Sequence, residues 1–295
     1  MTKHFLALMA FASICVLAAC GSGEERVAAS VSTHENVFLE KTIPDLSVTV
    51  FLDEEEFDKL PVELVNEDDL RKWARDLARG KDGFDQTMIP AKWNGQELVG
   101  GQDQVTLDEQ KLVEDILSLS VWEREVTLPI NRQAISARAE DINNIENKTI
   151  GHGRTSYNKS VSGRVENIRL STESVDYVVL GSGDTFTFNG IVGERTKERG
   201  YQVASVIMDG DFTDGLGGGI CQTSTTLYNA VLDAGLTVLE RHPHSLPVGY
   251  VEEGMDAMVS WGSADLRFRN DFDYPVVIRG GVDKEKGEVW FDIRK

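Results

Sequence analysis

The chain has 295 residues, 41% hydrophobic and 27% charged, a balance typical of folded globular proteins rather than disordered ones. Its formal net charge of -19 argues against binding to nucleic acid and against electrostatic attachment to anionic lipids or polymers. The length is enough for two domains.

The N-terminus reads as an export signal, with a basic start and an apolar run at 5–16 that is too short to span a bilayer. The sequence Leu-Ala-Ala-Cys-Gly at 17–21 resembles a bacterial lipobox, whose cysteine becomes the lipidated first residue. An ordinary cleaved signal peptide is the alternative. We therefore expect a signal peptide at 1–19, lipidation of Cys20, a polar tether at 20–35, and an extracytoplasmic protein anchored to an inner or outer bacterial membrane.

The region 36–145 has the patterns of an α+β domain. The run at 47–52 and the apolar alternation at 125–130 predict strands. Helical periodicity predicts one helix over 66–80 and another in the stretch 106–119. The region contains no cysteine and no histidine, and its acidic residues lie mostly on predicted helix exteriors, so we expect no catalysis there.

The ends of these helices are also marked in the sequence. Asn66 can cap the first helix and Gly80 can end it. Thr106 and Glu109 predict a capping box at the start of the second.

A second domain is expected at 146–295, where glycine, serine, threonine and asparagine become frequent. The spacing of apolar residues at 165–175 predicts a helix, and Phe186 and Phe188 predict one face of a strand followed by a hairpin turn at Asn189-Gly190. A C-terminal hairpin is predicted last, with Val289, Phe291 and Ile293 facing the core. We predict an α+β fold, with one main helix starting near Cys221 and packed on a mostly antiparallel sheet.

Cys221 is the only thiol expected in the mature chain, because Cys15 lies in the leader and Cys20 would carry lipid. It opens a predicted helix that Gly235 ends. The exposed amides and positive dipole of a helix start favour the thiolate. The three glycines at 217–219 let the backbone approach a ligand closely.

A nucleophilic thiol needs a base and an orienting carboxylate. His242 and His244 are candidate bases, and Asp256 or Asp265 could orient an imidazole. Gln222 could add a side-chain amide beside the sulfur, as part of an oxyanion site.

Three interpretations of Cys221 stay open. It could be a small buried hydrophobic residue, an activated nucleophile, or one ligand of a metal site with His242, His244 and Asp265. No CxxC or HExxH motif supports a metal, and no lysine follows the glycines to complete a phosphate cradle. We expect no cofactor and no metal.

The blocks "GGGICQTSTTLYNAVLDAGL", "ERHPHSLPVGYVEEGMDA" and "DLRFRND" occur in an order that resembles the VanW-like family of bacterial envelope proteins, over about residues 150–292. That family is tied to the cell wall and has no settled activity. The resemblance marks as signature positions Gly218, Gly219, Cys221, Gln222, Arg241, His242, His244, Ser245, Asp256 and Asp265. Met258 departs from the expected small β-branched residue.

The region 36–145 more weakly resembles a peptidoglycan-binding domain that often precedes VanW-like domains, and the stretch 81–105 matches poorly. Together, the resemblances imply a lipid-anchored envelope protein whose partner is peptidoglycan or a muropeptide. We predict that it binds this material through Gly218, Gly219, Gln222 and Arg241, as an accessory to wall maintenance or antibiotic response. A thiol-dependent peptidoglycan amidase, peptidase or transpeptidase and a non-catalytic scaffold are the alternatives.

Overall fold

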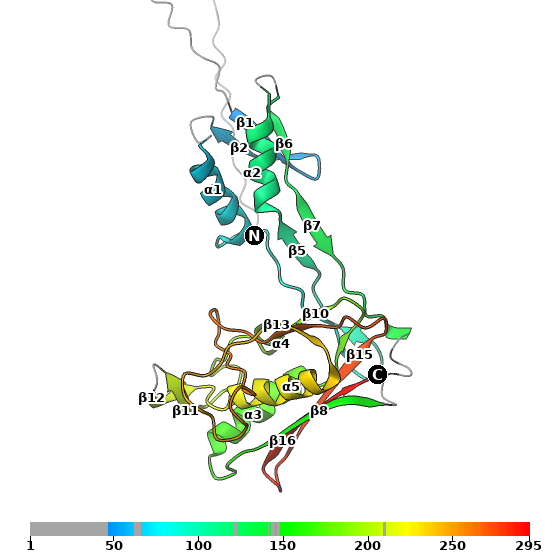
Figure 1. Ribbon diagram of the computed structural model, residues 1–295, viewed down its shortest axis with the longest axis vertical. Coiled ribbons are helices and arrows are strands. Elements are labelled where there is room, and N and C mark those ends of the chain that lie inside the picture. The colour runs from blue at the N-terminus through cyan, green and yellow to red at the C-terminus, as the bar shows by residue number, and fades with distance from the viewer. Residues whose placement is uncertain are drawn as a thin grey trace, which may run out of the picture. The chain divides into compact units, whose positions relative to one another are not determined.

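A computed structural model describes residues 47–61, 66–120, 123–140, 142, 145, 148–208 and 211–295 (Figure 1). The predicted signal peptide, the lipidation residue Cys20 and the tether lie outside these described residues. Within them, no helix is long and apolar enough to cross a membrane.

The described residues form five helices and several mostly antiparallel sheets, which confirms the predicted α+β class. The first part of the chain contributes β1 Ser47–Leu52, β2 Glu55–Pro61, α1 Glu67–Arg79, β3 Lys92–Trp93, β4 Leu98–Val99, β5 Gln104–Leu107, α2 Glu109–Ser118, β6 Glu125–Thr127 and β7 Ile130–Gln133. Apolar faces of α1 and α2 pack with β1 and β6 in one core cluster.

The caps of α1 confirm the prediction, and those of α2 correct it. The Asn66 side chain accepts a hydrogen bond from the Asp69 amide at 2.9 Å, and Gly80 ends α1. The capping box predicted from Thr106 was wrong, because Thr106 belongs to strand β5. Asp108 caps α2 instead, by accepting from the Lys111 amide at 2.9 Å.

The rest of the chain contributes β8 Thr149–Ser156, α3 Ser162–Val175, β9 Val178–Leu180, β10 Thr185–Thr187, α4 Phe188–Val192, β11 Val203–Met208, β12 Asp211–Leu216, α5 Ile220–Ala234, β13 Thr237–Glu240, β14 Arg267–Arg269, β15 Val276–Asp283 and β16 Glu288–Arg294. A six-stranded sheet has the order β4-β3-β9-β15-β16-β8. Because β3 and β4 join it, residues before 146 take part in this sheet, and the domain boundary at 145/146 stays a prediction.

Helix α5 lies across this sheet and packs on β8 and β16, while α3 packs on β15 (Figure 1). Two glycines of β8 permit the close approach of α5. A Cβ atom on Gly153 would lie 2.2 Å from the Thr226 carbonyl oxygen, and one on Gly151 would lie 2.4 Å from the Ala230 carbonyl oxygen. The main predicted helix therefore rests directly on the backbone of a strand.

The core between helices and sheet contains Val289, Phe291 and Ile293, all fully buried as predicted. The hairpin predicted at Asn189-Gly190 was wrong. Phe188 begins α4 rather than continuing β10, and Thr187 caps this helix by accepting from the Gly190 amide.

Candidate functional site

Cys221 lies in the first turn of α5, as predicted. Its helix cap, Gly219, has a φ of 108°, a left-handed backbone conformation that favours glycine. The Cys221 thiol is partly buried and donates to the Val259 carbonyl at 3.4 Å. The Cys221 amide finds no acceptor among the described residues, and first-turn amides point out of the N-terminal end of a helix.

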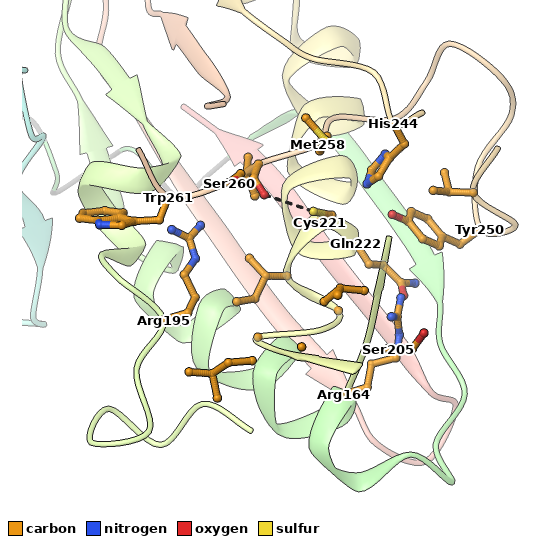
Figure 2. A pocket seen from close by; sticks show the side chains of 18 of the residues that line it. Arg164, Arg195, Ser205, Cys221, Gln222, His244, Tyr250, Met258, Ser260 and Trp261 are labelled. Atoms are coloured by element: carbon orange, nitrogen blue, oxygen red, sulfur yellow. Dashed lines mark hydrogen bonds between the residues drawn. The ribbon is translucent and has the colours of Figure 1, made fainter. Parts of the chain in front are cut away.

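His244 is the histidine that the fold brings to this thiol (Figure 2). Its side chain is 5% exposed, and its Nδ1 lies 2.7 Å from Asp256 Oδ2. Because Nδ1 is engaged with Asp256, the other ring nitrogen, Nε2, is available to interact with the Cys221 thiol. Burial alone would lower the pKa of His244, but hydrogen bonds and charge interactions with Cys221 and Asp256 outweigh it and raise that pKa.

Asp256 is the carboxylate that orients His244. Its Oδ2 also accepts from the His244 amide at 2.7 Å, and its Oδ1 accepts from Arg241 Nη2 at 2.6 Å. Burial works to raise the pKa of Asp256, yet the His244 hydrogen bonds and the Arg241 charge lower it below its usual range. The carboxylate is therefore ionised at neutral pH.

The polar run that follows Cys221 explains how Asp256 is held in place. Ser224 Oγ donates to the Ala257 carbonyl at 2.6 Å, and Thr225 Oγ1 accepts from the Ala257 amide at 3.0 Å. Asn229 Nδ2 donates to the Met255 carbonyl at 2.8 Å. Side chains of α5 thus fix the backbone on either side of Asp256, so the helix positions both the thiol and the acid.

Cys221 and His244 line a pocket of about 730 Å³, a volume typical of small-ligand sites, and Asp256 lies behind His244. Figure 2 shows Arg164, Arg195, Tyr250 and Trp261 around Cys221. Sequence reasoning named none of the four as a site residue, although Tyr250 lies within one of the blocks that carry the family resemblance. Burial and the neighbouring Cys221 raise the pKa of Tyr250, so its hydroxyl stays protonated.

Gln222 does not supply the free amide that we expected. Its Nε2 donates to Thr155 Oγ1 at 3.0 Å and to the Ser156 carbonyl at 2.9 Å. Its Oε1 accepts from Arg164 Nη2 at 2.8 Å. Gln222 therefore ties α5 to β8 and holds Arg164 at the pocket wall.

His242 and Asp265 lie apart from the thiol. The His242 side chain is 40% exposed and its Nε2 lies 2.9 Å from Glu240 Oε1. The Asp265 carboxylate accepts from the Thr187 hydroxyl and from the Asn189 amide at the start of α4. Burial raises the pKa of Asp265, although these hydrogen bonds oppose the rise. Of the two candidate bases and two candidate orienting carboxylates, His244 and Asp256 are therefore the pair that lies beside the thiol.

Of the remaining predicted positions, Gly218, Gly219, Arg241 and Ser245, Gly219 alone lines the pocket. A Cβ atom on Gly218 would lie 2.6 Å from the backbone of Ala204, so this glycine is needed for packing and does not line the pocket. The Arg241 guanidinium donates hydrogen bonds to Asp256 and to the Gly254 carbonyl. Ser245 is exposed.

The metal alternative lacks its ligand set. Among the described residues, no group of three or more histidines, cysteines and carboxylates could hold a metal ion. The reason is that His242 and Asp265 contact Glu240 and the start of α4 rather than Cys221.

Residues 163–293 match the VanW like protein family. An uncharacterized protein of Bacillus subtilis (strain 168), YoaR, is 43% identical over 141 residues, which cover 48% of this chain and 46% of YoaR. The vancomycin B-type resistance protein VanW of Enterococcus faecalis (strain ATCC 700802 / V583) is 32% identical over 136 residues, covering 44% of this chain and 50% of VanW.

The matched parts span about half the length of these two relatives. No solved structure matches the chain at a significant level. Residues 163–293 are thus a VanW-like family domain, related to a vancomycin resistance protein. The match begins in α3 and contains every residue that lines the pocket. The resemblance of residues 36–145 to a peptidoglycan-binding domain stays a prediction.

Proposed function

We propose that the VanW-like domain is a thiol-dependent enzyme that cleaves or exchanges amide bonds in cell-wall peptides. The observation that carries this proposal is the arrangement of Cys221, His244 and Asp256. The imidazole is hydrogen-bonded to a carboxylate on one side and interacts with the thiol on the other, and the imidazole and the thiol both line one pocket. Thiol hydrolases on unrelated folds use these three groups in these roles. The cell-wall substrate is inferred from the relation to VanW.

In the proposed reaction, Cys221 Sγ attacks the amide carbonyl carbon while its proton passes to His244 Nε2. The oxyanion that forms is stabilised by the free Cys221 amide at the positive end of α5. The C–N bond then breaks, the leaving amine takes the proton from His244, and a thioester remains on Cys221. Water or a second amine then attacks the thioester carbonyl carbon while His244 takes its proton. The C–S bond breaks, which releases the acid or the new amide, and His244 returns the proton to the Cys221 sulfur.

Each neighbouring residue has a defined part in this scheme. Asp256 holds the imidazole in the tautomer that presents Nε2 and stabilises the imidazolium. Arg241 is a positioning residue, because it touches Asp256 and does not line the pocket.

The first test is turnover of purified muropeptides by the full-length protein. We expect Cys221→Ala to abolish turnover and His244→Asn to lower it by about 10²-fold or more. His242→Asn is the matched control, since His242 also contacts a carboxylate but lies outside the pocket, and it should change the rate less than about twofold. Equal loss in both histidine variants would contradict the assignment.

A second test asks whether the thiol is a thiolate near neutral pH. Alkylation of Cys221 by iodoacetamide should be rapid at pH 7 and should slow in His244→Asn but not in His242→Asn. If Cys221 is labelled only after the protein is unfolded, its sulfur is buried in the core and the enzyme proposal is wrong.

A second candidate function is binding of wall peptide without chemistry. The contact between the Cys221 thiol and the Val259 carbonyl favours it, because the proton then points away from His244. In that case Cys221→Ala would retain full affinity for muropeptides and no variant would turn them over.

A further inference from the structure

Arg195 is a partly buried cation for which no ion pair with a carboxylate is found among the described residues. It lies in the loop between α4 and β11. Its Nη1 donates to Asn189 Oδ1 at 2.7 Å and to the Gly193 carbonyl at 3.1 Å. Its Nη2 is buried and has no hydrogen-bond partner among the described residues. Buried charges in proteins are normally paired, so the free Nη2 needs an explanation.

The nearest candidates for a partner are already engaged or exposed. The Asp265 carboxylate accepts from the Thr187 hydroxyl and from the Asn189 and Leu266 amides. Glu194 is the one carboxylate among the described pocket-lining residues, and it is exposed and makes no ion pair with Arg195. The guanidinium also lies over the Phe188 ring, with Cζ 5.7 Å from the centroid.

The free guanidinium group lies in the same pocket as the thiol. Figure 2 shows the Arg195 side chain extending from its loop toward Trp261 and Ser260, at the level of Cys221. Burial lowers the pKa of Arg195, and the nearby Tyr201, Cys221 and Asp265 oppose that shift. Arg195 and Cys221 are therefore close enough to interact electrostatically. Arg164 adds a second cation to the wall.

We propose that Arg195 forms a carboxylate-binding subsite, so that the pocket receives the free C-terminal end of a peptide. The guanidinium of Arg195, whose side chain lines the pocket, would turn its unpartnered Nη2 toward the terminal carboxylate and hold it while a carbonyl upstream faces Cys221. A planar guanidinium suits a carboxylate because the two form paired, charge-assisted hydrogen bonds. This inference rests on the proposed function only for the bond that is cleaved, since carboxylate binding needs no chemistry.

The ligand preference is testable in the Cys221→Ala variant of the full chain, in which turnover cannot interfere. The probes are a muramyl pentapeptide with a free C-terminal carboxylate and the same peptide with a C-terminal amide, compared by isothermal titration. We expect the acid to bind at least about tenfold more tightly than the amide, the effect of one charge-assisted hydrogen bond.

Adding Arg195→Gln should weaken the acid to the level of the amide and leave amide binding unchanged, while Arg195→Lys should retain part of the preference. Arg199→Gln is the matched control, because Arg199 is an exposed arginine four positions along the chain that does not line the pocket. It should keep the full preference. Circular dichroism and melting temperatures of all variants establish that they are folded.

The two proposals fail in different ways. Equal binding of acid and amide, or no binding of either at millimolar concentration, would overturn the carboxylate subsite even if muropeptides are turned over. If Arg195→Gln slows only the alkylation of Cys221 and leaves the acid preference intact, Arg195 serves the thiolate and the subsite is again overturned. An acid preference that depends on Arg195, without any turnover, would support the subsite and contradict the enzyme.

Discussion

Single residues of the pocket should make the stability of the fold depend on pH. The pKa of Asp256 is lowered, so its contribution is present above the unfolded value of about 3.9 and is lost as pH falls through the folded value. The pKa of His244 is raised, so its contribution is present below about 6.5 and is lost as pH rises through the folded value. Both contributions are therefore complete between about pH 4 and pH 6.5.

Asp256→Asn should destabilise the protein by about 3 kcal/mol in that window, because it leaves the buried His244 and the partly buried Arg241 without their carboxylate. The difference from the wild type should shrink above pH 7. Urea unfolding at several pH values measures it. Asp233→Asn is the matched control, since Asp233 accepts from both the amide and the ring of His152 in an exposed setting. A pH-independent difference for Asp256→Asn would contradict this account.

The sequence predicted Cys221, His244 and Asp256 as candidates but could not choose among the histidines and aspartates. His242 and His244 are two residues apart in the sequence, but only His244 lines the pocket. Its backbone amide is held by Asp256, a contact that the sequence does not reveal. Arg195 and Tyr250 could not be predicted, because their burial depends on segments that pack together only in the folded chain. Gln222 was predicted as a ligand-binding residue, yet the fold uses its polar atoms within the protein.

At the scale of elements, the contact between β8 and α5 depends on glycine. Gly153→Ala would place a methyl group 2.2 Å from the Thr226 carbonyl oxygen, and neither backbone can yield without separating helix and sheet. We expect a loss of about 3 kcal/mol or more in denaturant unfolding. Gly249→Ala is the control, because a Cβ atom there meets nothing within 4 Å. Similar midpoints for the two variants would show that α5 can shift.

The hydrogen bonds between α5 and the segment at 255–257 should matter more for activity than for stability. Ser224→Ala removes the donor to the Ala257 carbonyl and frees the backbone next to Asp256. We expect a loss of about 1–2 kcal/mol in unfolding free energy and a larger, roughly tenfold or greater, loss of muropeptide turnover. Thr226→Ser, which keeps the hydroxyl, should leave turnover close to that of the wild type. Unchanged turnover in Ser224→Ala would mean that Asp256 is held by Arg241 and His244 alone.

The elements that the sequence predicted best are those with local signals. Asn66 and Gly235 mark helix ends through their own side-chain and backbone chemistry, and the structure confirms both. Strand β8 was missed, because its inward positions are glycines that lie beneath α5 and give no apolar alternation. Asn189-Gly190 was misjudged for the opposite reason. Its local turn signal is overridden by two acceptors at the start of α4: the Thr187 cap and the Asp265 carboxylate, which is distant in sequence.

At the scale of the whole molecule, the charge of -19 bears on the predicted membrane anchor. So acidic a chain is repelled by anionic lipids, and raised salt weakens electrostatic attachment wherever it exists. Retention at a membrane would therefore have to come from a covalent lipid, which we propose is carried by Cys20. Several acyl chains on one residue would hold the protein independently of salt.

Metabolic labelling with a fatty acid in a bacterial host tests this anchor. The wild type should incorporate label and stay with the membrane fraction in about 1 M salt, where charge interactions are screened within about 3 Å. Cys20→Ser should lose the label. Cys15→Ser is the matched control, because Cys15 lies in the same leader within the part predicted to be removed, and it should be labelled like the wild type. If the wild type carries no label and is found unattached outside the cell, the alternative of an ordinary cleaved signal peptide is correct. The protein would then be secreted and would reach wall peptides without a membrane anchor.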